Sequence, residues 1–159
     1  MKYSESQALV KLAAYCSRAE RAEYDIRRKA ENWELSPNVI NNIVNKLKKE
    51  NYLNEERYCQ SFINDKLKFN RWGETKIKFE LKKKHISESV INSCLKNVRG
   101  EQFESPLFDL LSSKIKTIKA ANDYERKNKL IRFALGRGYT FEQVRKILQK
   151  FNLNDEEYP

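Results

Sequence analysis

Positively charged side chains are the groups in this chain whose number and spacing could do chemistry. The sequence has 32 Lys and Arg against 22 Asp and Glu, a formal net charge of +10. The excess is concentrated in residues 66–84, with eight cations and two anions, and in residues 114–150, with eleven cations and three anions. Such segments attract phosphate groups and acidic surfaces. Any single lysine, such as one in the run 82–84, can equally be part of a solvated helix end.

Contacts of these cations with nucleic acid would be made to phosphate, and would therefore not depend on base sequence. Trp72, which follows Arg71, could stack on a base, although packing between helical units is the better interpretation of this side chain. The candidate residues for binding a partner or DNA are Lys66, Lys68, Arg71, Lys76, Lys78, Lys82, Lys83, Lys84, Arg126, Lys127, Lys129, Arg132, Arg137, Arg145 and Lys146.

Catalytic and metal chemistry find little support in the sequence. His85 is the only histidine and follows three lysines, which excludes a multi-histidine zinc site and favours a surface position at a helix end. Cys16, Cys59 and Cys94 lie far apart on apolar helical faces, so we interpret them as small buried residues of a reduced protein. Residues 136–138 match no phosphate-binding loop and are interpreted as a helix stop. We predict no catalytic residue, no metal site and no cofactor.

The elements that must position these side chains are helices. Apolar residues recur at positions i, i+3, i+4 and i+7 through most of the 159 residues, and no stretch alternates with the period of a strand. Capping-box patterns begin at Ser4 and Thr140, and Ser36 precedes a proline at the first position of a helix. We predict an all-α fold with helices at residues 4–17, 21–33, 36–50, 54–70, 74–85, 87–98, 106–121, 123–137 and 140–151.

An internal repeat groups these helices. Residues 26–44 align without a gap with residues 77–95, at an offset of 51, and residues 130–148 follow as a weaker third copy at an offset of 53. In each copy a helix ends, one apolar residue points inward and a hydroxyl residue caps the next helix. These pairs are Leu35–Ser36, Ile86–Ser87 and Tyr139–Thr140.

The repeat predicts three tandem three-helix units that form an elongated and curved body, because a unit of this size buries too little surface to be stable alone. We place the units at residues 1–53, 54–98 and 106–151. A linker is expected at residues 99–105 and an acidic tail at residues 152–159.

The order of several short motifs resembles the RecX family of regulatory proteins, the bacterial modulators of the RecA recombinase. The segments that carry this resemblance are CSRAER at 16–21 with IRRKA at 26–30, YLNEERYC at 52–59, WGETKI at 72–77 with the E-L and K-H-I that follow, and LGRGY at 135–139. Each is a weak signal alone, whereas their order and spacing are fairly specific and cover nearly the whole chain.

The resemblance implies an all-α protein of three three-helix repeats without enzymatic activity. It implies binding of the RecA–DNA filament in its helical groove, with contacts to single- or double-stranded DNA through phosphate. It also implies restraint of filament extension, ATP hydrolysis, strand exchange and coprotease action, and hence a role in DNA recombination, DNA repair and the SOS response.

Two other functions remain open from the residues alone: a nonspecific DNA-binding helical module, and a helical-repeat adaptor for another acidic protein. No apolar run approaches the roughly 18–20 residues of a membrane span, and the first residues lead into a helical pattern instead of a secretory segment. We therefore expect a cytoplasmic protein without a membrane partner, and a monomer. The curvature, the convergence of the cations and the sign of the regulation stay open.

Overall fold

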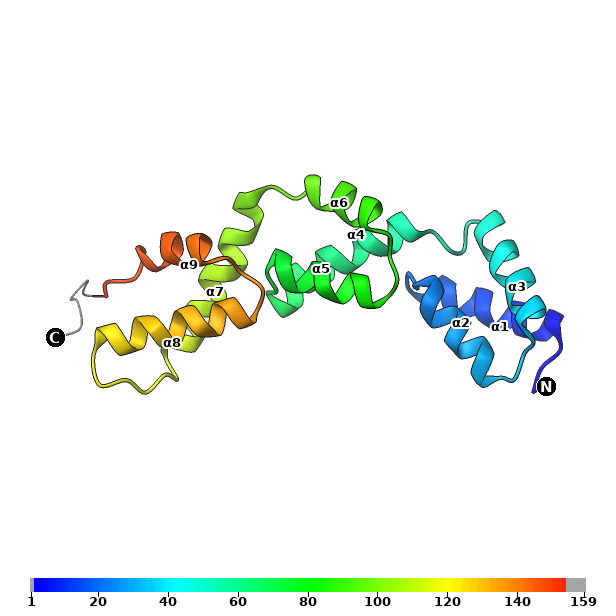
Figure 1. Cartoon of the computed structure of the whole chain (residues 1–159), viewed down its shortest axis with the longest axis horizontal. Helices are drawn as coiled ribbons and strands as arrows, with labels where there is room; N and C mark the ends of the chain where they lie inside the picture. The colour runs from blue at the N-terminus through cyan, green and yellow to red at the C-terminus, as the bar shows by residue number, and fades with distance from the viewer. Residues whose placement is uncertain (1, 154–159) are drawn as a thin grey trace. The chain divides into compact units, whose positions relative to one another are not determined.

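The computed structural model describes residues 2–153, which form helices joined by short turns and contain no β-strand (Figure 1). The prediction of an all-α fold is confirmed. Of the acidic tail predicted at 152–159, only residues 152 and 153 belong to the described part. The helical segments are α1 (Glu5–Arg18), α2 (Glu23–Asn32), α3 (Pro37–Lys49), α4 (Glu55–Asp65), η1 (Lys66–Asn70), α5 (Glu74–Lys83), α6 (Glu88–Lys96), η2 (Gly100–Phe103), α7 (Glu104–Ile115), α8 (Asp123–Gly136) and α9 (Phe141–Leu148).

The chain divides into two compact units. The first comprises residues 1–62 and 81–94, and the second comprises residues 63–80 and the residues from 95 onward. In the first unit, α1, α2 and α3 lie together (Figure 1), and their apolar stripes meet in a core that includes Leu12, Ile26 and Leu47. Burial of each such side chain contributes about 1.5–3 kcal/mol of stability. This core therefore holds the three helices, and the side chains on their surfaces, in place.

The second unit has its own core. Helices α7, α8 and α9 pack against one another, and Leu111, Leu130 and Ile147 are almost completely buried. Figure 1 shows α8 lying alongside α7. Among the helices of residues 2–153, none is long and apolar enough to cross a bilayer.

The internal repeat recurs as the same turn in three places. Glu34, His85 and Gly138 each follow a helix with a positive φ, of 60°, 58° and 98° respectively. The next residue donates its backbone N–H to a carbonyl five residues earlier, which is the Schellman motif that ends a helix. These bonds are Leu35 to Ala30 (3.3 Å), Ile86 to Leu81 (3.3 Å) and Tyr139 to Ala134 (3.2 Å).

The helix starts that were predicted from hydroxyl residues are confirmed at three sites. Ser36 Oγ accepts the backbone N–H of the residue three positions later at 3.3 Å, and Pro37 occupies the first position of α3. Ser4 and Thr140 each form a complete capping box with the glutamine three residues on. A cap of this kind contributes about 0.5–2 kcal/mol, so local sequence fixes where these helices begin.

The predicted end of the helix at 106–121 is wrong. The corresponding helix, α7, begins two residues earlier and ends at Ile115. The carbonyl of Lys114 accepts both the backbone N–H and the hydroxyl of Thr117, each at 3.0 Å. This local bonding competes with a continuing helix, and the apolar residue Ile118 therefore extends the periodic pattern without extending the helix.

Two further segments have structure that the periodicity did not predict. The segment 99–105 contains the 3-10 turn η2 and the first residues of α7, and Phe103 within it is buried. The helix predicted at 54–70 is α4 followed by the π-helical turn η1, after which Arg71 adopts φ 54°. A non-glycine residue in this region is strained, and single π-turns often occur at functional sites.

Candidate basic interface

A backbone joint connects the segment after η1 with the turn between α8 and α9, and both belong to the second unit. The N–H of Gly73 donates to the carbonyl of Arg137 at 2.7 Å, and the N–H of Thr75 donates to the carbonyl of Gly138 at 3.1 Å. The buried hydroxyl of Tyr139 donates to the carbonyl of Arg71 at 2.9 Å. Burial raises the pKa of Tyr139 far above its ordinary value of 10, so this hydroxyl stays protonated as a donor.

The joint requires glycine on both sides. A Cβ on Gly73 would lie 2.4 Å from the carbonyl carbon of Gly138, and a Cβ on Gly138 would lie 2.5 Å from the Cβ of Lys76. The positive φ of Gly138 adds a second requirement. The interpretation of residues 136–138 as a helix stop is confirmed. Their close approach to Gly73, 65 positions away in the sequence, was not predicted.

The joint brings the two basic segments of the sequence together. Arg71 Nη1 donates to Ser113 Oγ at 3.5 Å, and the Trp72 ring has Lys66 Nζ at 4.9 Å and Lys76 Nζ at 4.7 Å from its centroid. On the other side, the Phe133 ring has two cations within 5 Å of its centroid, Lys114 Nζ and the guanidinium of Arg137. We call Lys66, Arg71, Lys76, Lys114 and Arg137 the joint cluster.

The joint cluster differs from most other basic residues because its cations lie over aromatic rings or beside a hydroxyl. For Lys76, Lys114 and Arg137 the contact is a ring, which carries no counter-charge. Trp72 is half-buried beneath two lysines, as expected for packing and not for base stacking. Lys114 was absent from the predicted set, and the only signal for it was its place in the basic segment 114–150.

Several predicted cations instead form ion pairs. The exposed pair Lys146–Glu104 (2.7 Å) lowers the pKa of Glu104 and raises that of Lys146, chiefly through a charge-assisted hydrogen bond. The other pairs are Lys82–Glu88 (3.9 Å), Lys84–Asp25 (2.8 Å), Arg126–Asp123 (2.7 Å) and Lys129–Glu125 (3.0 Å). Exposed pairs are worth less than about 1 kcal/mol, so a ligand can open them, but their charge is locally compensated.

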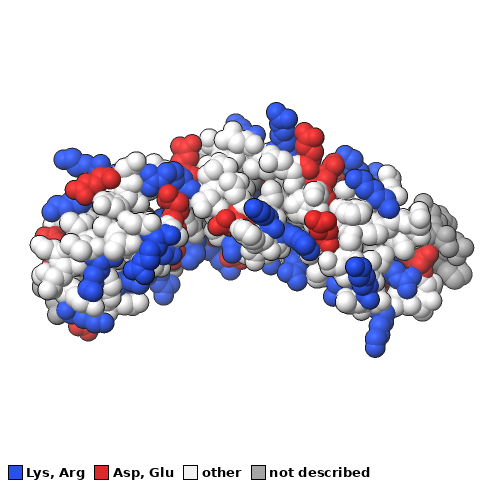
Figure 2. Space-filling view, turned by 180° about the vertical axis from the view of Figure 1, so that it is seen from behind, with Lys and Arg blue, Asp and Glu red and all other residues white. Residues whose placement is uncertain are grey.

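The remaining predicted cations are dispersed. Lys127 and Arg145 line a cavity of about 440 Å³ together with exposed Phe141. Lys68 lies over the ring of exposed Phe69. Lys78 is half-buried, whereas Lys83 and Arg132 are exposed. On the face in Figure 2, Lys and Arg lie among Asp and Glu and do not form one uninterrupted strip.

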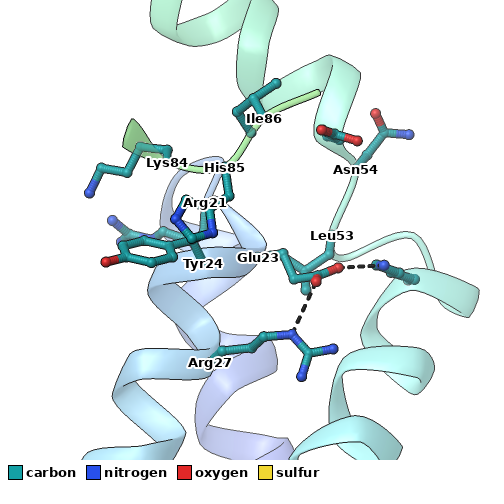
Figure 3. A pocket seen from close by; sticks show the side chains of 11 residues that line it. Arg21, Glu23, Tyr24, Arg27, Leu53, Asn54, Lys84, His85 and Ile86 are labelled. Atoms are coloured by element: carbon teal, nitrogen blue, oxygen red, sulfur yellow. Dashed lines mark hydrogen bonds and ion pairs between the residues drawn. The ribbon is translucent and has the colours of Figure 1, made fainter. Parts of the chain in front are cut away.

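A larger cavity, of about 550 Å³, lies in the first unit between α2 and the turn that follows α5 (Figure 3). Glu23 there accepts from Arg27 Nε at 3.0 Å and pairs with Lys48. Burial raises the pKa of Glu23, but the bonds and charges of these two cations outweigh it, and the net pKa is lowered. The charged groups of this cavity thus compensate one another in large part.

His85 lines the same cavity as an exposed residue and lies against the ring of Tyr24, with ring centroids 4.5 Å apart. Its surface position at a helix end is confirmed. The three cysteines are buried and free, as predicted, and burial with neighbouring Cys94 raises the pKa of Cys59 to about 12. In the described part of the chain, no group of three or more His, Cys, Asp or Glu could hold a metal ion.

Two regions of the chain match models of known protein domains. The model of the second three-helix domain of RecX matches residues 54–95, and the model of its third three-helix domain matches residues 107–148. The chain belongs to the RecX family. The two halves of the joint lie one in each matched domain, since Gly73 falls in the second and Gly138 in the third.

Curated RecX relatives extend the similarity beyond these domains. The regulatory protein RecX of Clostridium perfringens strain SM101 is 28% identical over 137 residues, which are 85% of this chain and 64% of the relative. RecX of Clostridium beijerinckii is 30% identical over 132 residues, 82% of this chain and 61% of the relative. The chain thus spans slightly less than two thirds of the length of these RecX proteins.

Solved RecX structures share the fold. The crystal structure of RecX from Lactobacillus salivarius superposes with a TM-score of 0.78 at 19% identity, over 93% of this chain and 96% of that chain. A second crystal structure, of a regulatory protein RecX, gives a TM-score of 0.82 at 19% identity, over 91% of this chain and 71% of that one. At this identity the superpositions establish the helical-repeat fold of RecX.

Proposed function

We propose that this chain binds the RecA–DNA filament in its helical groove and restrains the recombinase. The restrained activities are filament extension, ATP hydrolysis, strand exchange and coprotease action, and the processes served are DNA recombination, DNA repair and the SOS response. The observation that carries the proposal is membership of the RecX family, whose curated members are named regulatory proteins. The protein acts without catalysis, as a monomer, in the cytoplasm.

The joint cluster supports a phosphate contact in this function. Its five cations come from both basic segments and are held by rings, a hydroxyl and a backbone joint. We infer that Arg71, Lys76, Lys114 and Arg137 engage the DNA backbone ahead of the paired cations, because a paired cation must first give up its carboxylate. Contacts from the three proposed units, residues 1–53, 54–98 and 106–151, would add avidity without a single strong site.

The first test is the DNA-dependent ATPase of RecA filaments titrated with the full chain. We expect hydrolysis to slow at substoichiometric to near-stoichiometric ratios of chain to RecA. The variant Lys76→Gln/Lys114→Gln should inhibit less, and its binding to DNA should show a salt dependence flatter by roughly 0.7–0.9 per lost phosphate contact. Lys129→Gln/Lys146→Gln, which removes two paired cations, is the matched control with the same change in charge.

Unchanged ATPase activity with the unaltered chain at saturating ratios contradicts the proposal. A nonspecific DNA-binding module is the second candidate, favoured by the same joint cluster. It would bind free DNA as tightly as filaments and would lose affinity steeply with salt. Fluorescence anisotropy with labelled oligonucleotides across a salt series, with and without RecA, separates the two functions.

A further inference from the structure

A second cationic surface lies on the first unit, outside the two matched family domains and outside the predicted basic segments. A groove of about 420 Å³ runs along α1 and the end of α2. Its cations are Lys11, Arg18 and Lys29, and no described residue that lines it is acidic. The first 53 residues carry only ten cations against seven anions, so overall charge gave no sign of this surface.

Three carboxylates that lie between Arg18 and Lys29 in the sequence pair with cations that do not line the groove. Glu20 accepts from Arg57 Nε at 2.8 Å, and Asp25 pairs with Lys84 at 2.8 Å. Glu23 bonds Arg27 and Lys48 in the cavity of Figure 3. Two of the groove cations, Lys11 and Lys29, instead lie over rings, which carry no counter-charge.

The rings of the groove are already covered. Tyr15 has the guanidinium of Arg21 at 3.6 Å and Lys29 Nζ at 4.2 Å from its centroid. Tyr3 and Trp33 meet edge to face, with centroids 4.9 Å apart and an interplanar angle of 78°. A nucleic-acid base needs an open ring face for stacking. Because other side chains already lie against these rings, they are poor platforms for a base.

An apolar side chain stands among the cations. Val10 lines the groove and is 69% exposed, and it lies in α1 between Lys11 and the buried Ala8. Phosphodiester backbone makes no use of an exposed valine. A protein segment that carries carboxylates beside an aliphatic or aromatic side chain matches both features, the apolar centre and the positive rim.

We propose that this α1–α2 groove docks an acidic, amphipathic segment of a partner protein. An apolar side chain of that segment packs on Val10, and its carboxylates meet Lys11, Arg18 and Lys29. The inference rests on the proposed function for the identity of the partner, which is the protein component of the filament. It assigns the first unit to protein contact and the joint cluster to DNA contact.

The test measures affinity of the full chain for two probes, RecA filaments assembled on dT36 with a nonhydrolysable ATP analogue, and dT36 alone. The groove variants are Lys11→Glu/Lys29→Glu and Val10→Asp. The matched control is Lys46→Glu/Lys49→Glu, the same charge change at two exposed positions of α3. Circular dichroism and thermal melting show whether each variant is folded.

We expect both groove variants to lose at least about tenfold in filament affinity, while the control stays within about threefold of the unaltered chain. Affinity for dT36 should fall equally in the groove charge variant and the control. Filament affinity equal to that of the control overturns the inference. A selective loss for dT36 also overturns it and makes the groove a nucleic-acid site. If the unaltered chain binds no filament, the proposed function itself fails.

Discussion

At the scale of single residues, the fifteen candidate cations differ in what each one touches. Lys84 pairs with Asp25, 59 positions away, whereas Lys76 lies over Trp72, only four positions away. The second contact is local in the sequence, since Trp72 lies two residues before the start of α5, which carries Lys76. The first depends on the tertiary fold, so the periodic pattern could not reveal it.

Glu23 gives a prediction about pH. Its pKa in the folded protein lies below the ordinary value of 4.5. Its stabilising contribution is therefore fully present above about pH 4.5 and is lost as the pH falls through the lower folded-state pKa. Because the carboxylate is partly exposed, solvent screening keeps the effect below about 1 kcal/mol.

The variant Glu23→Gln should accordingly lower the free energy of unfolding at pH 7 and should approach the unaltered protein at pH 3. Urea denaturation at the two pH values measures this difference. Glu31→Gln, an exposed position on the same helix, is the control and should change little at either pH. A Glu23→Gln deficit that is equally large at pH 3 would show that lost packing, and not the ion pairs, is responsible.

At the scale of elements, the local rules were sufficient for most of the fold. Caps at Ser36 and Thr140 and the repeated helix–turn pattern predicted the helices and their threefold repeat, because both depend on residues within one or two turns. The local rules were insufficient where side-chain bonding to the backbone ends a helix early, as at Thr117. They were also insufficient where two backbone segments distant in the sequence come into contact. The contact of Gly73 with Gly138 is of the second kind, and no helical period encodes it.

Gly73→Ala should therefore destabilise the second unit strongly. The added Cβ would lie 2.4–2.5 Å from backbone atoms of Gly138 and Tyr139, so the backbone would have to shift to remove the clash. Overpacking of this kind costs about 1–3 kcal/mol of stability. Chemical denaturation measures the loss, and binding to DNA should weaken with it because the joint holds the cluster. Gly100→Ala is the control, since a Cβ there would meet nothing within 4 Å. Equal stability of the two variants would contradict a tight joint.

At the scale of the whole molecule, the net charge of +10 is distributed unevenly over distinct surfaces. Several of the predicted cations are compensated by carboxylates, the joint cluster collects cations from two distant segments, and the α1–α2 groove is positive in a region of small net charge. We infer that the chain presents separate surfaces to nucleic acid and to protein, which suits a regulator whose target contains both.

Electron microscopy of RecA filaments on single-stranded DNA, with and without the full chain, tests binding in the filament groove most directly. We expect added density that follows the helical groove, together with shorter filaments when the chain is present during assembly. The Lys76→Gln/Lys114→Gln and Lys11→Glu/Lys29→Glu variants should each reduce the density. Empty grooves and unchanged filament lengths at a saturating concentration of the unaltered chain would contradict binding in the filament groove.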